Sequence, residues 1–376
     1  MKIIKCLILV GIFTISILSQ TMAQELKLGS VQPLTGGGSL FGLTAKQGFT
    51  MAMEDLNQKG GVDGKKLEII LYDSTTKPPV AATLAQRLLF EDKVPLIFGS
   101  ASSVDTLAMM EVTERAQFPL FTPSASAPLI TEKGYKWIWR VGQTDKICAT
   151  LLGKAISRKS DWNKVAFLYE NTDYGRTPCE VLAGILKGMK GKQVVGMEIY
   201  NKGDTDMTGQ LMKLKNSNPD LLVTWGYYTE AALIARQAQQ IGLRAKTQLF
   251  GNQSLSFPEY IKLAGPAAEG VMFIESTSSS INPNSKIQAF VKRYEEKFKR
   301  ACYNTSVDCY DGVMIIAEVL KKVGTDPKRI QNALNTTTFE GTAESIKFDS
   351  RGQNLKGALM AKVEGGNFKF LEYLQY

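Results

Sequence analysis

Strand and helix signals alternate along almost the whole chain, and this alternation constrains the fold more than any other feature. Short apolar runs typical of buried strands are each followed by a segment with apolar residues at helical spacing, such as Phe49, Met53 and Leu56. Successive β-α units of this length predict a parallel, doubly wound α/β sheet. Two antiparallel strands joined by a hairpin at 364–367 are expected at the end of the chain.

The expected elements can be given by residue range. Strands are expected at 26–32, 67–73, 96–99, 120–122, 164–169, 194–200, 221–224, 248–250, 270–274, 357–363 and 368–374. Helices are expected from Thr44 to the Gly pair at 60–61 and at 78–91, 178–190, 206–217, 230–241, 285–300, 310–323 and 327–335. Phe41 then lies in a Gly-rich loop over 33–42, and Tyr174 lies in a loop over 170–175.

The chain is long enough for two lobes. Its 376 residues exceed one typical domain, and 44% hydrophobic residues are sufficient for a packed core. A second series of β-α units begins after Val141. Two α/β halves of similar plan are therefore expected.

The first residues have the composition of a secretory signal. Lys2 and Lys5 precede an apolar run over 7–18, and Thr21 and Ala23 place small residues where a signal peptidase cleaves. Residues 1–23 are therefore expected to be a signal peptide that is removed before Gln24. The run is too short for a typical spanning helix, and a retained N-terminal anchor is the alternative.

Cysteine usage is compatible with export. Removal of the signal peptide leaves four cysteines, an even number that permits two disulfides in an oxidising compartment. Cys302 and Cys309 flank a short polar loop and are the favoured pair. Cys148 and Cys179 are interpreted as small buried residues.

Charge and residue types argue against several classes of function. The net charge of +9 comes from 45 Lys and Arg against 36 Asp and Glu, spread along the chain without a dense basic run, so nucleic acid is not an expected partner. The chain has no His, which removes the usual general base and the commonest metal ligand. We find no phosphate-binding loop or metal-ligand cluster and expect no enzymatic activity, no cofactor and no metal.

Two strands end in loops of small hydroxylic residues. The strand at Ile97 and Phe98 runs into 99–103 and then a helix, and the strand at 120–122 runs into 123–128. Such turns present backbone N–H groups beside Ser hydroxyls, a favourable arrangement for an anion at the carboxyl ends of parallel strands. We expect the two loops to hold a small carboxylate. The alternative is that Ser102 or Ser103 only caps the helix.

An ordered set of segments resembles one family, the periplasmic solute-binding proteins of branched-chain amino acid ABC transporters. The segments are 47–73, 99–105, 122–128, 173–175, 203–206, 219–220 and 310–321. This resemblance implies a type I periplasmic binding protein fold, with two α/β lobes joined by three crossovers and a ligand in the cleft. The N-terminal lobe is expected to comprise 24–141 plus 276–349, and the C-terminal lobe 142–275 plus 350–376.

The resemblance also implies a binding site. Ser103 and the segment Ser124-Ala125-Ser126 correspond to positions that hold the ligand carboxylate, Phe41 to an aromatic wall, and Tyr174 and Tyr227 to lids from the second lobe. The alternatives are that Phe41 only fills its own lobe and that the tyrosines are ordinary loop residues.

One position departs from the family pattern. The amino-acid binders place an acidic residue where this chain has Gln253, to hold the ligand ammonium. Loss of one partner of a buried ion pair costs about 3–5 kcal/mol. Either another acid serves, with Glu230 and Asp105 as candidates, or the ligand is an aromatic or aliphatic carboxylate or a small amide.

The implied function follows from the resemblance. We expect an exported, periplasmic binding protein that captures a small carboxylate, with an amino acid as the first candidate, and delivers it to a membrane ABC permease. The lobes are expected to close on the ligand by a hinge motion. A soluble ligand sensor of the same fold is the alternative.

Overall fold

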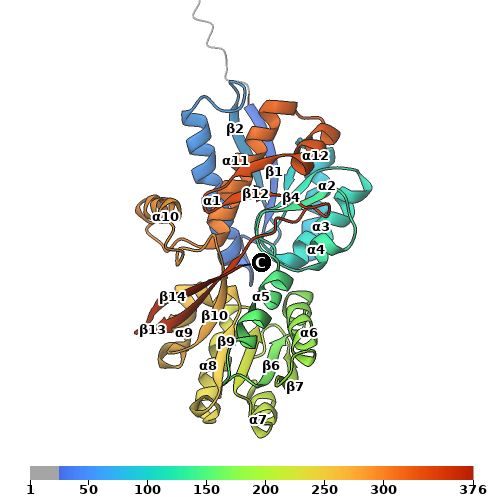
Figure 1. Cartoon of the computed structure of the whole chain (residues 1–376). Coiled ribbons are helices and arrows are strands. Elements are labelled where there is room, and N and C mark those ends of the chain that lie inside the picture. The colour runs from blue at the N-terminus through green and yellow to red at the C-terminus, as the bar shows by residue number, and fades with distance from the viewer. Residues whose placement is uncertain (1–24, 376) are drawn as a thin grey trace, which may run out of the picture.

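The computed structural model describes residues 25–375 (Figure 1). The expected signal peptide over 1–23 lies outside the described residues. The described chain forms two α/β lobes stacked end to end, each with its own sheet and its own buried apolar clusters. No helix among residues 25–375 combines the length and the apolar character that a membrane crossing needs.

The first lobe is built on a five-stranded parallel sheet of order β2-β1-β3-β4-β5. Its strands are β1 (Glu25–Gln32), β2 (Lys66–Asp73), β3 (Ile97–Phe98), β4 (Leu120–Thr122) and β5 (Ile138–Arg140). Its helices are α1 (Ser39–Gln58), α2 (Pro78–Phe90), α3 (Ser103–Arg115), α4 (Leu129–Glu132) and, from later in the chain, α10 (Ser285–Phe298), α11 (Asn304–Val323) and α12 (Pro327–Thr336). A small antiparallel pair, β11 (Thr338–Glu340) and β12 (Ser345–Lys347), completes it.

The second lobe is built on a seven-stranded sheet of order β14-β13-β10-β9-β8-β6-β7. Its strands are β6 (Lys164–Glu170), β7 (Gln193–Tyr200), β8 (Leu221–Trp225), β9 (Gln248–Gly251), β10 (Met272–Ser276), β13 (Ala358–Glu364) and β14 (Asn367–Leu374). Its helices are α5 (Asp145–Ser157), α6 (Asp173–Lys187), α7 (Thr208–Asn216), α8 (Tyr228–Gln240) and α9 (Pro258–Ala264), with 3-10 turns at Leu243–Ala245, Gln253–Ser256 and Gly265–Ala268. The strands are parallel except β13 and β14, which pair antiparallel as the hairpin signal predicted.

The chain passes between the two sheets three times. It crosses between β5 and α5, between β10 and α10, and between β12 and β13. The expected architecture of two α/β lobes joined by three crossovers is therefore confirmed. The residue bounds expected for each lobe stay a prediction.

Helix α1 begins earlier than expected. It begins at Ser39, so Phe41 lies on its first turn and not in a Gly-rich loop. Gly42, expected to end that loop, is inside the helix, where any Cβ would collide with the carbonyl oxygen of Pro33. The glycine is therefore needed for close packing of the first turn, not for a flexible loop.

Helix α6 also begins earlier than expected, at Asp173 and not at Pro178. Thr172 caps it, because its Oγ1 accepts a hydrogen bond from the Gly175 N–H at 3.3 Å. Pro is common at the first position of a helix, which is why Pro178 suggested the start, but here it lies one turn inside. Tyr174 is thus a helical residue of fixed direction.

The expected bridge between Cys302 and Cys309 is not formed. All four cysteines of the described chain are free and buried. Cys309 faces the main core of the first lobe, whereas Cys302 packs beside α10 in a separate cluster. Burial raises the pKa of both thiols well above the ordinary value, so both remain protonated and unreactive.

Candidate functional site

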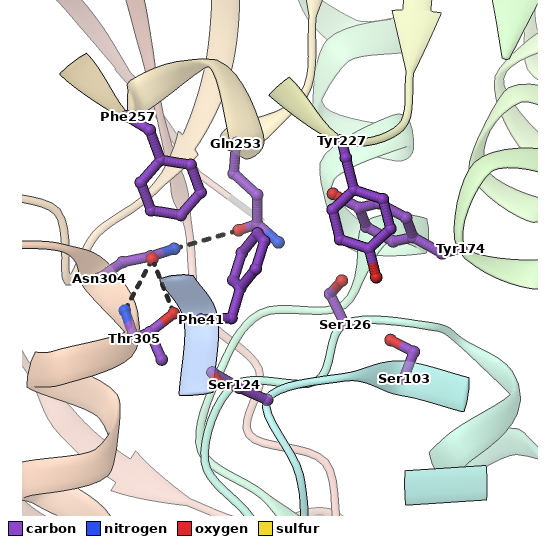
Figure 2. A pocket seen from close by; sticks show the side chains of 11 residues that line it. Phe41, Ser103, Ser124, Ser126, Tyr174, Tyr227, Gln253, Phe257, Asn304 and Thr305 are labelled. Carbon is purple, nitrogen blue, oxygen red and sulfur yellow. Dashed lines mark hydrogen bonds between the residues drawn. The ribbon is translucent and has the colours of Figure 1, made fainter. Parts of the chain in front are cut away.

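A narrow cavity lies where the two lobes meet (Figure 2). The first lobe lines it with Phe41, Ala101, Ser103, Ser124, Ser126, Asn304 and Thr305, and the second lobe with Tyr174, Tyr227, Gln253 and Phe257. Its free volume is about 30 Å³, room for a water molecule or two. A solute of amino-acid size therefore enters only when the side chains of the wall or the lobes themselves move.

The cavity residues come from the ends of strands in both sheets. Ser103 follows β3, the two lining serines 124 and 126 follow β4, and Tyr174 follows β6. Tyr227 and Gln253 follow β8 and β9 in the same way. The parallel strands of each lobe thus direct their carboxyl ends towards one crevice, as expected for an open α/β sheet.

The serines form the polar floor of the cavity. The Ser103 Oγ accepts a hydrogen bond from the Ala127 N–H at 3.2 Å, which joins the start of α3 to the second Ser loop. The hydroxyl of Ser124 is buried and has no hydrogen-bond partner among residues 25–375. Ser102 occupies the cap position of α3, but its side chain makes no capping bond. The simple capping interpretation therefore does not account for these hydroxyls.

Aromatic rings form the wall and cross from one lobe to the other. The Phe41 ring centroid lies 4.9 Å from that of Phe257 and 5.7 Å from that of Tyr227, both edge to face. Tyr227 in turn lies 5.4 Å from Tyr174. Such pairs each contribute about 0.5–1.5 kcal/mol beyond the area that they bury. Phe41 therefore does not merely fill its own lobe.

The Tyr174 side chain is held in place by hydrogen bonds. Its hydroxyl oxygen accepts from the Asn252 Nδ2 at 2.6 Å, and the Ser254 hydroxyl donates to the Asn252 Oδ1 at 2.9 Å. Burial raises the pKa of Tyr174 well above its ordinary value, so the phenol stays protonated. Tyr174 is thus a fixed part of the wall.

Asn304 connects the lobes on the other side of the cavity. From the first turn of α11 its Nδ2 donates to the Gln253 Oε1 at 3.3 Å and to the Glu275 Oε1 at 3.1 Å, both in the second lobe. Its Oδ1 accepts from the Thr305 N–H at 2.7 Å. Figure 2 shows the bonds from Asn304 to Gln253 and Thr305 at the edge of the cavity.

No acidic side chain is among the residues that line the cavity in the described chain. Of the two candidates, Glu230 accepts the Gly203 N–H at 2.9 Å and Asp105 accepts the Ser74 hydroxyl at 2.6 Å, and both lie outside the lining. Burial raises the pKa of Asp105. Neither acid therefore supplies the cavity with the carboxylate that is absent at position 253.

Comparison with known proteins agrees with this geometry. Residues 25–367 match the family described as periplasmic binding protein. The chain belongs to this family. It is 29% identical over 331 residues to the leucine-, isoleucine-, valine-, threonine- and alanine-binding protein of Pseudomonas aeruginosa, across 88% of this chain and 87% of that protein.

Solved periplasmic binding proteins share the fold. A leucine-binding protein from Thermotoga maritima superposes with a TM-score of 0.85 at 26% identity, across 93% of this chain and 99% of the other. A solute-binding protein of an ABC transporter from Rhodopseudomonas palustris, solved with 3,4-dihydroxybenzoic acid, gives 0.84 at 23% identity, across 93% and 97%. The resemblance inferred from the sequence is confirmed. The family consists of substrate-binding proteins of transporters.

The residues expected to bind ligand in this periplasmic binding protein meet at the cavity with one exception. Ala125 is buried outside the lining, and its carbonyl oxygen accepts from the Arg140 Nη1 at 2.9 Å. The sequence did not single out four lining residues, Ala101, Phe257, Asn304 and Thr305. Ala101 lies within a loop already identified. Phe257 and the first turn of α11 carried no sequence signal that pointed to a ligand.

Proposed function

We propose that the protein is exported to the periplasm, loses residues 1–23, and captures a small carboxylate solute that it delivers to an ABC permease. One observation carries this proposal: Ser103 and Tyr174, which belong to different lobes, line one cavity. A site shared between lobes favours their closed arrangement when it is occupied. The permease can then distinguish the loaded protein by the relative position of its lobes.

The chemistry of the floor suits a carboxylate. Hydroxyls of Ser103, Ser124 and Ser126 face the cavity, and the N-terminal N–H groups of α3 lie beside them. The unpartnered Ser124 hydroxyl offers a free donor for an anionic oxygen. The aromatic wall suits an apolar body attached to that carboxylate.

The relatives support a carboxylate without deciding which one. The Pseudomonas aeruginosa protein is named for amino acids, and the Rhodopseudomonas palustris protein was solved with an aromatic acid. Both ligand types carry a carboxylate. An amino acid remains the first candidate from the sequence, and an aromatic or aliphatic carboxylate is the second.

Ligand binding can be screened by thermal shift with amino acids and amine-free carboxylates. A ligand at about a hundred times its Kd stabilises the fold by about 2.7 kcal/mol. Ser124→Ala is expected to leave the unliganded stability unchanged, since the hydroxyl has no protein partner, and to weaken binding at least tenfold. Ser160→Ala, at an exposed serine of the second lobe, is the matched control.

Two results would contradict this proposal. One is that no carboxylate in the screen stabilises the protein. The other is that Ser124→Ala and Tyr174→Ala both bind a carboxylate hit with the wild-type affinity, which would place its site elsewhere.

A further inference from the structure

The orientation of the Asn304 amide is fixed by a backbone group. The Thr305 N–H can only donate, so the Asn304 atom 2.7 Å away must be the oxygen Oδ1. The Nδ2 then faces the second lobe. There it donates to the Glu275 Oε1, an oxygen that also accepts from the Ser276 N–H at 2.6 Å. Both ends of the amide are therefore assigned without ambiguity.

The Asn304 amide in turn fixes Gln253. Because Asn304 Nδ2 is a donor, the Gln253 atom 3.3 Å away must be its carbonyl oxygen Oε1. The Gln253 Nε2 is left without a hydrogen-bond partner in the part of the chain that the structure describes, and Figure 2 shows it on the cavity side. Gln253 thus presents its two Nε2 N–H donors to a ligand. Its carbonyl oxygen, the atom of this side chain that could accept from a ligand ammonium, already accepts from Asn304.

This arrangement depends on contact between the two lobes at the cavity. Asn304 is on α11 of the first lobe and Gln253 follows β9 of the second. A second contact across the same side, the Tyr303 hydroxyl to the Glu259 Oε2 at 2.9 Å, holds the lobes together there. An enclosed solute therefore meets the nitrogen of Gln253.

A lysine adds positive charge beside the aromatic wall. The Lys202 Nζ lies 4.6 Å from the centroid of the Tyr227 ring, which lines the cavity. Its side chain extends to the first lobe, where a Cβ on Gly37 would lie 3.2 Å from that Nζ. The ring face of Tyr227 is thus already engaged by a cation, which leaves it less able to attract a ligand ammonium.

Three buried acids near the cavity, Asp145, Glu170 and Glu275, each accept hydrogen bonds on one carboxylate oxygen only among the described residues. Burial raises the pKa of Asp145 to about 6, that of Glu170 to about 7 and that of Glu275, behind Asn304, to about 8, so the charged form of each is disfavoured. None of the three lines the cavity.

We propose that the solute is an amine-free carboxylate with an apolar, aromatic or branched aliphatic body, selected against its amino-acid counterpart because Gln253 presents its amide N–H groups to the ligand. This inference rests on the proposed function. A hydroxyl or carbonyl oxygen on the solute can accept from the Gln253 Nε2, whereas an ammonium at the same place would face the N–H donors of Gln253 and would find only neutral side-chain oxygens elsewhere in the lining. A buried ammonium without a partner is strongly unfavourable.

Matched pairs of solutes test the proposal on the mature wild-type protein. We choose leucine with 4-methylpentanoate, and phenylalanine with 3-phenylpropanoate, with benzoate as a further probe; within each pair the members differ only in the amine. Isothermal titration calorimetry is expected to give at least tenfold tighter binding for the amine-free member of any pair that binds. Tighter or equal binding of the amino acid overturns the inference and leaves the proposed function standing. No binding of any probe or of the wider carboxylate panel overturns both.

Two variants test the cause of the selectivity. Gln253→Glu places an acceptor on the cavity side, and Asn304→Asp makes the Gln253 amide turn so that its oxygen faces the ligand. In each variant, the affinity for the amino acid relative to its amine-free counterpart is expected to rise at least tenfold. Gln240→Glu, the same change at an exposed site on α8, is expected to leave the ratio unchanged.

The variants remain informative when one of them folds poorly, because they act on different lobes. Circular dichroism first confirms that each variant is folded. If the affinity ratio stays unchanged in each of the two variants that folds, the role of Gln253 is overturned. If both fail to fold, the wild-type pairs still decide the proposal.

Discussion

Glu275 is an acid kept in a place where its charge is unfavourable. It is fully buried at the end of β10, and burial raises its pKa to about 8. Its Oε1 accepts from Ser276 N–H and from Asn304, so one oxygen is satisfied and the other has no partner in the described chain. Near neutral pH a proton on this group is favoured over a buried charge.

A consequence for stability can be measured. The native state holds the Glu275 proton up to about pH 8 and the unfolded state releases it near pH 4.5, so the free energy of unfolding falls as the pH rises through this window. Glu275→Gln is expected to reduce that fall and to be more stable than wild type at pH 8 by at least about 1 kcal/mol, since one pKa unit is about 1.4 kcal/mol. Urea unfolding at pH 5 and pH 8 checks this, and parallel pH profiles would contradict it.

At the residue scale the sequence predicted groups that follow strand ends and missed groups brought in from elsewhere. Ser103 was identifiable from the Ser loop that follows a buried strand, and Tyr227, which follows β8, was assigned through the family resemblance. Asn304 follows the loop after α10, and its role depends on meeting Gln253 from the other lobe, which no local pattern shows. Ala125 was predicted with its neighbours, but strand-end loops place alternate side chains inward, and its carbonyl serves Arg140 instead.

Helices α1 and α11 form the most extensive helix contact of the first lobe. Gly48 lies at the crossing, where any Cβ would collide with the Ser306 carbonyl oxygen and lie 2.9 Å from the Cys309 Cβ. The backbones can approach because the side chain is absent. This contact also carries the first turn of α11, and therefore Asn304, to the cavity.

Gly48→Ala is accordingly expected to destabilise the protein by about 1–3 kcal/mol, since the added methyl forces backbone to shift. Gly184→Ala provides the matched control, because this exposed helical glycine on α6 has nothing within 4 Å of its Cβ position. Removal of the glycine there is expected to stabilise by about 0.5–1 kcal/mol. Equal unfolding midpoints for the two variants would contradict this account.

Among the elements, helical periodicity predicted several helices that bury one broad face and missed α5, which is buried over most of its surface. The expected bounds of α2, α8 and α12 agree with the structure to within two residues. Helix α5 was not predicted, because it is buried along most of its surface between α6 and the sheet and keeps only a narrow polar stripe of Lys146, Thr150 and Lys154.

At the scale of the whole molecule, a buried polar cluster connects the segments that cross between the lobes. Lys356, in the third crossover, lies 3.1 Å from the Asp308 carboxylate of α11, and both side chains are only 3% exposed. Ser278, in the second crossover, donates to Asp308 at 2.6 Å and accepts from Lys356 at 3.0 Å. This buried cluster joins two crossovers to the first lobe.

Lys356→Met is expected to lower the free energy of unfolding by about 3–5 kcal/mol, because it leaves the Asp308 charge buried without its partner. Addition of Asp308→Asn is expected to recover part of that loss, since the remaining charge is then removed. Urea unfolding of the two single variants and the double variant gives the coupling energy. Strictly additive effects would show that the pair does not act as a unit.

The three crossovers also constrain the order in which the two lobes can fold during synthesis. As the chain leaves the ribosome, β1 to β5 appear first, yet α11, whose Gly312 lies against Phe98 and Phe121 of that sheet, appears only after most of the second lobe. The first lobe therefore begins to fold first but is completed last. Until α11 is made, one apolar face of its sheet is not covered. A chaperone that recognises nascent chains would meet that face, and no single cut of the gene can yield either half intact.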